Sequence, residues 1–272
     1  MLILHGLESS PNAAYVRGLV RRLHIECRWN AAVLEFRGCH IQLNQGRYLY
    51  NSGDTRDVDS AAAHLIATGA GERGLFVVGF SLGGNVAARW LAQVDASHAA
   101  AAHLRGAALI SAPYDLAQSA RLLDRALGGR YTRYFLRSLK RKALAKERQH
   151  PGCVDADGVR RARTMVEFDT YATARLHGYR DAWDYYEQCS SFAVVEKIAT
   201  PTLLLSARDD PMIPPSAFPT AACARNPTLT AALLDAGGHL GFVEGAYPGR
   251  ARYWAERAIV RFLRAAALQR RK

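Results

Sequence analysis

Short apolar runs alternate with longer stretches of helical pattern along most of this 272-residue chain. The runs are rich in aliphatic and β-branched residues, which is typical of strands that are buried on both faces. The six runs are Leu2–Leu4, Ala31–Phe36, Leu75–Val78, Ala107–Ile110, Thr202–Leu205 and Leu229–Leu234. Helical patterns such as Asn12–Leu23 and Thr55–Thr68 lie between them. This order predicts an α/β fold with a mainly parallel sheet of about six strands, flanked by helices on both faces.

One interval between two of these runs is too long for a single crossover helix. Roughly 90 residues separate Ser111 from Pro201, and their pattern is helical and rich in tyrosine. Tyr131, Tyr134, Phe135 and Leu139 have the spacing of one face of an amphipathic helix. We therefore expect a single domain over residues 1–272, with a helical cap inserted at about residues 114–196.

A serine lies between two glycines where the third run meets a helical pattern. Gly79-Phe80-Ser81-Leu82-Gly83 has the form G-x-S-x-G, and the residues that follow favour a helix. Such a turn from strand to helix holds a nucleophilic serine in strained backbone, and small flanking residues let the strand and the helix approach closely. An ordinary glycine-rich turn is the alternative for this segment alone.

Two further runs end in residues that could complete a site with Ser81. Asp209 and Asp210 follow the fifth run, and His239 lies in a glycine-flanked loop after the sixth. Ligands gather at the carboxyl ends of parallel strands, and the chain order Ser, Asp, His is that of α/β-hydrolases. The sequence therefore predicts a catalytic Ser-His-Asp site.

An oxyanion hole is expected beside the serine. In this architecture it is formed by the backbone N–H after the nucleophile and by one from the loop after an early strand. The first run leads into "LHGLESS", so the two donors are predicted to be the N–H groups of Leu82 and Leu7.

Composition and charge exclude several other classes of protein. The chain is 49% hydrophobic and 22% charged, with neither a secretory leader nor a run of membrane-spanning length. Five widely spaced cysteines without a CxxC pair argue against a zinc site or a disulfide framework. We expect a soluble, cytoplasmic protein, without nucleic acid as a partner because no zinc finger, helix-turn-helix or RNP motif is present.

Basic residues are concentrated in the expected cap. Ten Arg or Lys lie between Ala117 and His150, against two acidic residues, and the formal net charge of the chain is +12. The stretch from Arg133 to Arg148 could make a weak contact with an anionic membrane surface. A solvated helix face is the favoured interpretation.

Several blocks of the sequence resemble a known family over practically the whole chain. The blocks are "HGLESS", "FRGC", "NSGDT", "VGFSLGGNV", "SAPYDL", "YFLRSLKRKALAK", "LHGY", "CSS", "ARDDP" and "GGHLGF". In this order they are similar to the YheT-like branch of α/β-hydrolases, also called AB hydrolase family four. That family includes bacterial proteins assigned as esterases and eukaryotic lipid hydrolases.

The resemblance implies esterase or acylglycerol-lipase activity, with Ser81 as nucleophile, Asp210 as the acid and His239 as the base. The hydrolase pattern after this strand is Asp, three residues and Pro, which Asp210 and Pro214 match. Asp209 remains the alternative, and would need the loop to shift by one residue. Family members normally have a stretch before the first run that supplies the first strands of the sheet. We expect those strands to be missing here, so that one apolar edge of the sheet is left unpaired. Either a partner chain covers this edge or the sequence is a truncated version of a longer protein, and truncation is the favoured interpretation.

These features together predict a serine hydrolase that cleaves short-chain or acylglycerol-type esters through an acyl-enzyme, without a metal or an organic cofactor. An acyltransferase or a thioesterase with the same site is one alternative. A non-catalytic binding protein with the same fold is another, because a fold does not dictate a function.

Overall fold

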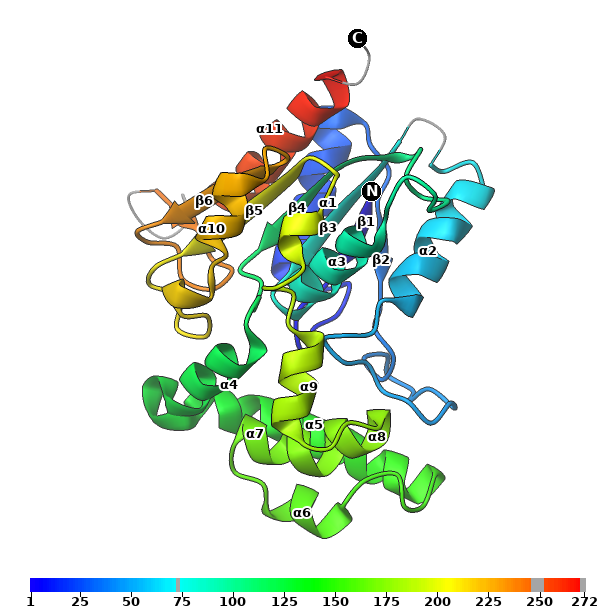
Figure 1. Cartoon of the computed structure of the whole chain (residues 1–272), viewed down its shortest axis with the longest axis vertical. Helices are drawn as coiled ribbons and strands as arrows, with labels where there is room; N and C mark the ends of the chain where they lie inside the picture. The colour runs from blue at the N-terminus through cyan, green and yellow to red at the C-terminus, as the bar shows by residue number, and fades with distance from the viewer. Residues whose placement is uncertain (72–73, 246–251, 270–272) are drawn as a thin grey trace.

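The computed structural model describes residues 1–71, 74–245 and 252–269. Within them, the main sheet has six parallel strands in the order β2-β1-β3-β4-β5-β6 (Figure 1). The strands are β1 Leu2–Leu4, β2 Ala32–Leu34, β3 Leu75–Phe80, β4 Leu104–Ile110, β5 Thr202–Ala207 and β6 Leu229–Leu234. All six predicted strands are present, and β2 lies at the sheet edge beside β1. Strand β3 extends to Phe80, so Ser81 directly follows it.

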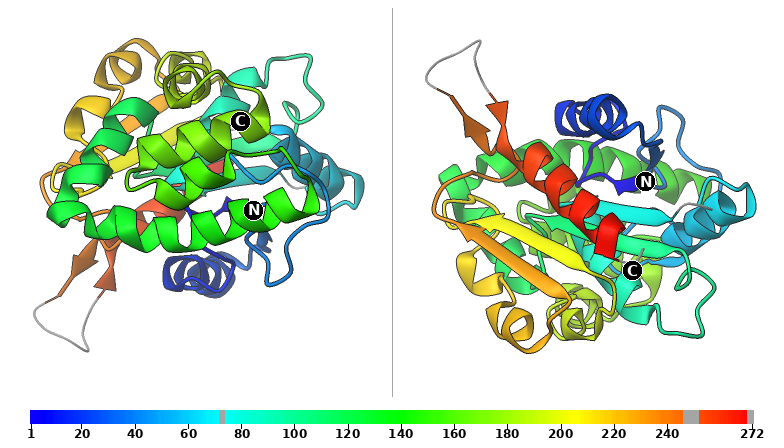
Figure 2. Two further views of the ribbon diagram at one scale, coloured as in Figure 1. Left: turned by 90° about the horizontal axis from the view of Figure 1, so that it is seen from below. Right: turned by 90° about the horizontal axis from the view of Figure 1, so that it is seen from above.

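Alternate residues of each strand pack against opposite helical layers, as expected for a sheet that is buried on both faces. Leu2 and Leu4 belong to one hydrophobic cluster, whereas Ile3 between them belongs to another. Figure 2 shows helices on both sides of the sheet. One layer consists of α1 Ala14–Cys27 and α11 Trp254–Gln269. The other consists of α2 Arg56–Ala67, α3 Leu82–Gln93 and α10 Thr220–Arg225.

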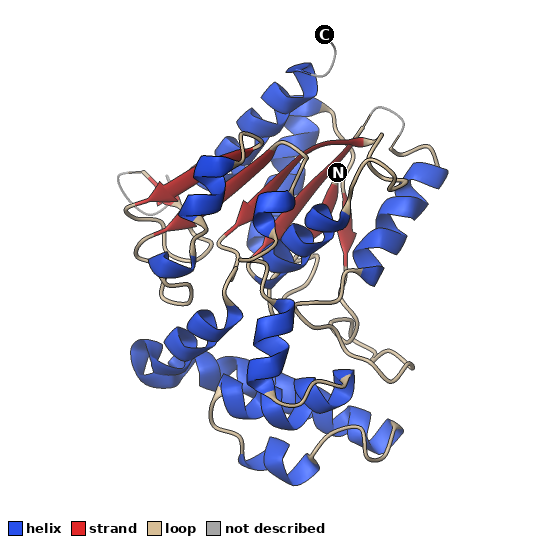
Figure 3. Ribbon diagram, in the orientation of Figure 1, coloured by secondary structure: helices blue, strands red, loops and turns tan. Residues whose placement is uncertain are grey.

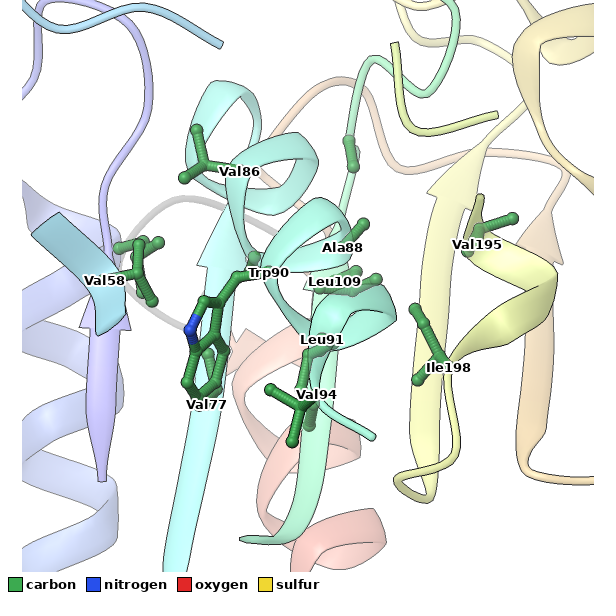
Figure 4. Packing of buried hydrophobic residues seen from close by; sticks show 14 of the residues in the cluster. Val58, Val77, Val86, Ala88, Trp90, Leu91, Val94, Leu109, Val195 and Ile198 are labelled. Atoms are coloured by element: carbon green, nitrogen blue, oxygen red, sulfur yellow. The ribbon is translucent and has the colours of Figure 1, made fainter. Parts of the chain in front are cut away.

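Helix α3 is anchored against the middle of the sheet (Figure 4). Its residues Trp90 and Leu91 are almost completely buried in the cluster that also contains Val77 of β3 and Leu109 of β4. The indole N–H of Trp90 donates to Asp59 of α2 at 3.0 Å. The start of α3, which follows Ser81, is therefore fixed by packing over most of the helix length.

The segment between β4 and β5 forms helices beyond the carboxyl ends of the strands (Figure 3). Its elements are α4 Leu116–Arg125, η1 Ala126–Gly129, α5 Arg130–Gln149, α6 Ala156–Arg161, α7 Met165–Phe168, the π-helical turn η2 Asp169–Ala174, α8 Arg175–His177, α9 Ala182–Cys189 and η3 Val195–Lys197. We call this segment the cap. It has a hydrophobic cluster of its own, formed by residues from α4 to α9. The cap therefore has an apolar interior that lies against the edge of the sheet where strands end.

The prediction for the apolar face of α5 was wrong at Tyr134. Leu139 is buried as expected, but Tyr134 has 68% of its surface exposed. The buried stripe of this helix instead runs through Leu136, Leu139 and Ala143. Because successive helical residues turn by 100°, Tyr134 lies almost opposite Leu136 and faces solvent.

The remaining elements lie after β5. They are η4 Pro215–Ala217 and a small antiparallel pair, β7 Val243–Glu244 with β8 Arg252–Tyr253. We did not predict β7 and β8, because two-residue strands are too short to give a recognisable alternation of apolar and polar residues.

Candidate active site

Ser81 lies in the sharp turn between β3 and α3. Its backbone has φ 52° and ψ −125°, in a region that residues with a side chain rarely adopt. The turn is held by the Ser81 N–H, which donates to Ile110 O at 2.8 Å, and by the Gly84 N–H, which donates to Ser81 O. Strain that is fixed in this way by its surroundings is common where a side chain must be presented to a ligand.

The two glycines that flank Ser81 are required by close packing. A Cβ atom on Gly79 would lie 2.4 Å from Gly83 O. One on Gly83 would lie 2.5 Å from His5 O and 2.6 Å from Leu4 O. Any side chain at these positions would push α3 away from β1 and β3. The G-x-S-x-G pattern therefore reflects contacts between backbones on both sides of the serine.

His239 joins Ser81 to Asp210. The Nε2 atom of His239 lies 2.9 Å from Ser81 Oγ, and Nδ1 lies 2.8 Å from Asp210 Oδ2. The Asp210 side chain is fully buried, and its other oxygen accepts the N–H groups of Met212 and Ile213. A carboxylate fixed in this way keeps the proton of His239 on Nδ1, so that Nε2 is free to accept the Ser81 hydroxyl.

Asp209 has a different set of partners from Asp210. Its Oδ1 atom accepts the N–H groups of Gly237 and Gly238, at 2.9 and 2.8 Å. Gly238 has a φ of +61°, which favours glycine. The two neighbouring aspartates therefore differ in what they bind. Asp210 contacts the imidazole of His239, and Asp209 holds the backbone of the loop that contains His239.

The loop after β1 passes directly beside the serine. A Cβ atom on Gly6 would lie 3.2 Å from Ser81 Cβ. His5 is fully buried, and its Nε2 accepts the Phe36 N–H while Nδ1 donates to Gly6 O. Burial lowers the pKa of His5, in keeping with a neutral ring that fixes the backbone of this loop.

The two expected oxyanion donors lie on one cavity with Ser81. Leu7 follows Gly6, Leu82 is the first residue of α3, and both line the cavity together with the serine. The N-terminal end of α3 also favours negative charge at this point, because its first N–H groups have no partner within the helix.

Two buried polar residues that support this site were not anticipated. Ser111 follows β4 with a φ of +47°, and its hydroxyl donates to His239 O. Asn85 of α3 donates to Ser52 O and Cys189 O and accepts the Ser191 N–H, so it ties α3 to the end of α9. Neither residue could be recognised from the sequence, because a single serine or asparagine within an apolar stretch does not differ from an ordinary polar position.

The cavity beside Ser81 has a volume of about 140 Å³ and extends into the cap. Its walls are predominantly apolar. The larger apolar side chains that line it are Leu7, Leu49, Leu82, Leu116, Leu123, Phe135, Leu139, Met165, Phe168, Leu176, Met212 and Ile213. Most of them belong to cap helices, so the cap determines the shape of the space that faces the serine.

Within the cap, the carboxyl group of Asp169 lines this apolar cavity. Asp169 begins the π-helical turn η2, and its two oxygens accept hydroxyl groups from Thr173 and Tyr186, each at 2.6 Å. Burial raises the pKa of Asp169 to about 6, because the charged carboxylate loses its contact with water, and the two hydroxyl hydrogen bonds offset this only in part.

Asp169 should make the stability of the protein depend on pH. A pKa that is higher in the folded state than in the unfolded state means that stability falls as pH rises from about 4 to 6. The loss is about 3 kcal/mol, for a pKa that moves from 3.8 to about 6. We expect Asp169→Asn to remove this slope in urea unfolding curves measured at pH 4.5 and pH 7. Asp157→Asn, at an exposed position, is the matched control, and an unchanged slope in Asp169→Asn would contradict the prediction.

Among the described residues, no group of three or more His, Cys, Asp or Glu side chains is arranged to hold a metal ion. No helix in the described ranges is long and apolar enough to cross a membrane.

A family model described as the alpha/beta hydrolase fold matches residues 1–246. The chain is 35% identical over 253 residues to "Putative esterase YheT" of Escherichia coli (strain K12), covering 90% of this chain and 71% of that protein. It is 27% identical to the monoacylglycerol lipase of Saccharomyces cerevisiae, covering 97% of this chain and 58% of that protein. The chain therefore spans less than two thirds of the yeast relative.

Among solved structures, the esterase Pf2001 of Pyrococcus furiosus has a similar fold. The TM-score is 0.59 at 17% sequence identity, and the match covers 97% of this chain and 81% of that one. At this identity the likeness concerns the fold.

Proposed function

The chain belongs to the alpha/beta hydrolase fold family, and from this premise we propose that it is a serine esterase that cleaves carboxylic esters through an acyl-enzyme. The observation that carries the proposal is the continuous chain of hydrogen bonds from Ser81 through His239 to Asp210. The names of its relatives, an esterase and a monoacylglycerol lipase, support the same class of substrate.

The reaction begins with attack of Ser81 Oγ on the ester carbonyl. His239 Nε2 takes the hydroxyl proton, and Asp210 stabilises the imidazolium that forms. The carbonyl oxygen, now negatively charged, receives hydrogen bonds from the N–H groups of Leu7 and Leu82 and lies near the N-terminal end of α3. His239 then gives its proton to the departing alcohol. Water, deprotonated by the same imidazole, releases the acid and restores Ser81.

The size of the apolar cavity indicates which acyl chains are accepted. A cavity of roughly 150 Å³ in another protein holds one benzene molecule, so the 140 Å³ beside Ser81 suits an acyl group of about six carbons. Its walls make hydrophobic contact and offer few polar groups, as is usual for ligand sites. We therefore place short acyl esters, including short-chain acylglycerols, ahead of long-chain lipids.

A series of p-nitrophenyl esters tests this preference. We expect kcat/KM to rise about fourfold for each added CH₂ from acetate to hexanoate, which is the effect of burying one methylene group. Beyond hexanoate the rise should stop, because the cavity is full. Rates are measured below the concentration at which each ester forms micelles, with the Ser81→Ala variant as background. A rise that continues to palmitate would show that the cap opens to admit long chains.

A further inference from the structure

A second hollow lies on the other side of helix α5 from the apolar cavity. It has a volume of about 890 Å³, and its walls are formed by the helix, by the loop at residues 38–43 and by residues 8–10. Four cationic side chains of α5 line it, namely Arg137, Arg141, Lys142 and Arg148, against one carboxylate, Glu8. We call it the cationic hollow.

In the described part of the chain, the arginines of the cationic hollow have no acidic partner. Arg137 and Arg141 are one helical turn apart, and Arg148 lies two turns further along the same face. Among the described residues, none of these three guanidinium groups forms a salt bridge. Several unpaired charges of one sign that line a concave surface concentrate the electric field there and attract a counter-ion more strongly than the same charges on a convex face.

The cationic hollow adjoins the candidate active site. Glu8 and Lys142 line both the hollow and the apolar cavity, and they form an ion pair at 2.8 Å. Glu8 directly follows Leu7, has a φ of +52°, and accepts the hydroxyl of Tyr50 on the same oxygen. A carbonyl held at the Leu7 N–H would therefore lie one residue from the boundary between the two spaces.

We propose that the cationic hollow binds an anionic group, a phosphate or a carboxylate, carried by the alcohol portion of the ester substrate. This rests on the proposed esterase function. With the acyl chain in the apolar cavity and the carbonyl at Leu7, the alcohol portion extends past Glu8 and Lys142 to Arg137 and Arg141. Guanidinium groups suit this task because their paired N–H donors match phosphate and carboxylate oxygens.

A matched pair of soluble esters tests the proposal. The anionic ester is 1-butyrylglycerol 3-phosphate, the neutral one is 1-butyrylglycerol, and release of butyrate is measured for both. We expect the wild type to have the higher kcat/KM for the phosphate ester. In Arg137→Gln/Arg141→Gln, the ratio of the two kcat/KM values should fall at least about tenfold, since hydrogen bonds to a charged group are lost. Raising the salt concentration should lower the wild-type ratio as well.

The control variant is Arg130→Gln/Arg133→Gln, which removes the same charge from the same helix outside the cationic hollow. Its ratio should equal that of the wild type. If this ratio falls equally in both double variants, the effect comes from the overall charge of the cap and the proposal is wrong. An unchanged ratio in Arg137→Gln/Arg141→Gln would also overturn the proposal. All four arginines are exposed, so folding should be preserved, and circular dichroism and melting temperature verify this.

Two further measurements separate the proposal from its alternatives. Binding of glycerol 3-phosphate by calorimetry needs no turnover, so a loss of binding in Arg137→Gln/Arg141→Gln would support the hollow even if the esterase proposal failed. Vesicles with and without anionic lipid test the membrane contact that the sequence left as the less favoured alternative to a solvated helix face. If Arg137→Gln/Arg141→Gln binds vesicles more weakly but leaves the ratio of kcat/KM values for the two soluble esters unchanged, the arginines bind a lipid surface and the proposal is wrong.

Discussion

Replacing Ser81 by Ala is expected to lower kcat/KM for p-nitrophenyl butyrate by at least about a thousandfold, because removal of one member of a Ser-His-Asp triad usually costs several orders of magnitude. The substitution deletes only the Oγ atom, whose partner is His239 Nε2, so packing around the turn is unchanged. We expect the melting temperature to stay within about 3 °C of the wild type, since no buried apolar contact is lost.

A fluorophosphonate probe provides an independent measurement of the same serine. Attack of Ser81 Oγ forms a P–O bond and expels fluoride, while the proton passes to His239. Labelling of the wild type and its absence in Ser81→Ala would distinguish an activated serine from the polar residue of a non-catalytic binding protein. Retention of a tenth of wild-type turnover by the variant would show that another residue is the nucleophile.

The order of strands and helices along the chain could be predicted because the strands are short, apolar and separated by helical patterns. Strand β3 is an example. Its residues pack alternately against two helical layers, so both of its faces need apolar side chains and the strand stands out as an apolar run. The boundaries were less predictable. At Phe80 the strand continues into the G-x-S-x-G turn, where glycine obscures the pattern of apolar residues.

The proximity of the candidate site residues could also be predicted, because each of them follows a strand at the same edge of the sheet. Ser81 and His239 are examples, and Gly79 and Gly83 gave a local signal that reflects real close contacts. The surroundings of the site could not be predicted in this way. The ion pair between Glu8 and Lys142 joins residues 134 positions apart, and only the path of the cap brings them together.

The face of α5 that carries the arginines shows a second limit of sequence patterns. A count of basic residues between Ala117 and His150 predicts a charged surface, but it does not tell which charges share a concave wall. Tyr134, which we expected in the apolar face, instead lines the cationic hollow together with Arg137 and Arg141. Periodicity gives the angle between side chains, whereas the orientation of the helix is set by which stripe packs best against the rest of the cap.

The choice between the two neighbouring aspartates leads to the second large effect. Asp210→Asn is expected to lower kcat/KM by about 10⁴-fold, as the equivalent change does in another Ser-His-Asp enzyme. In this variant the amide oxygen can still accept the N–H groups of Met212 and Ile213, which leaves the NH₂ group facing His239 Nδ1. The imidazole proton would then move to Nε2, where it prevents that atom from accepting the Ser81 hydroxyl.

Asp209→Asn should be far milder, with a loss of at most about tenfold, because an asparagine oxygen can still accept a hydrogen bond from the Gly237 and Gly238 N–H groups. Asp209→Ala removes that acceptor, so it should reduce turnover further by loosening the loop of His239, while Ser81 and Asp210 remain in place. The three variants are compared by kcat/KM for p-nitrophenyl butyrate, with melting temperatures as the check on folding. If Asp209→Asn loses more activity than Asp210→Asn, then Asp209 rather than Asp210 orients the imidazole during turnover, and the loop must shift by one residue when substrate binds.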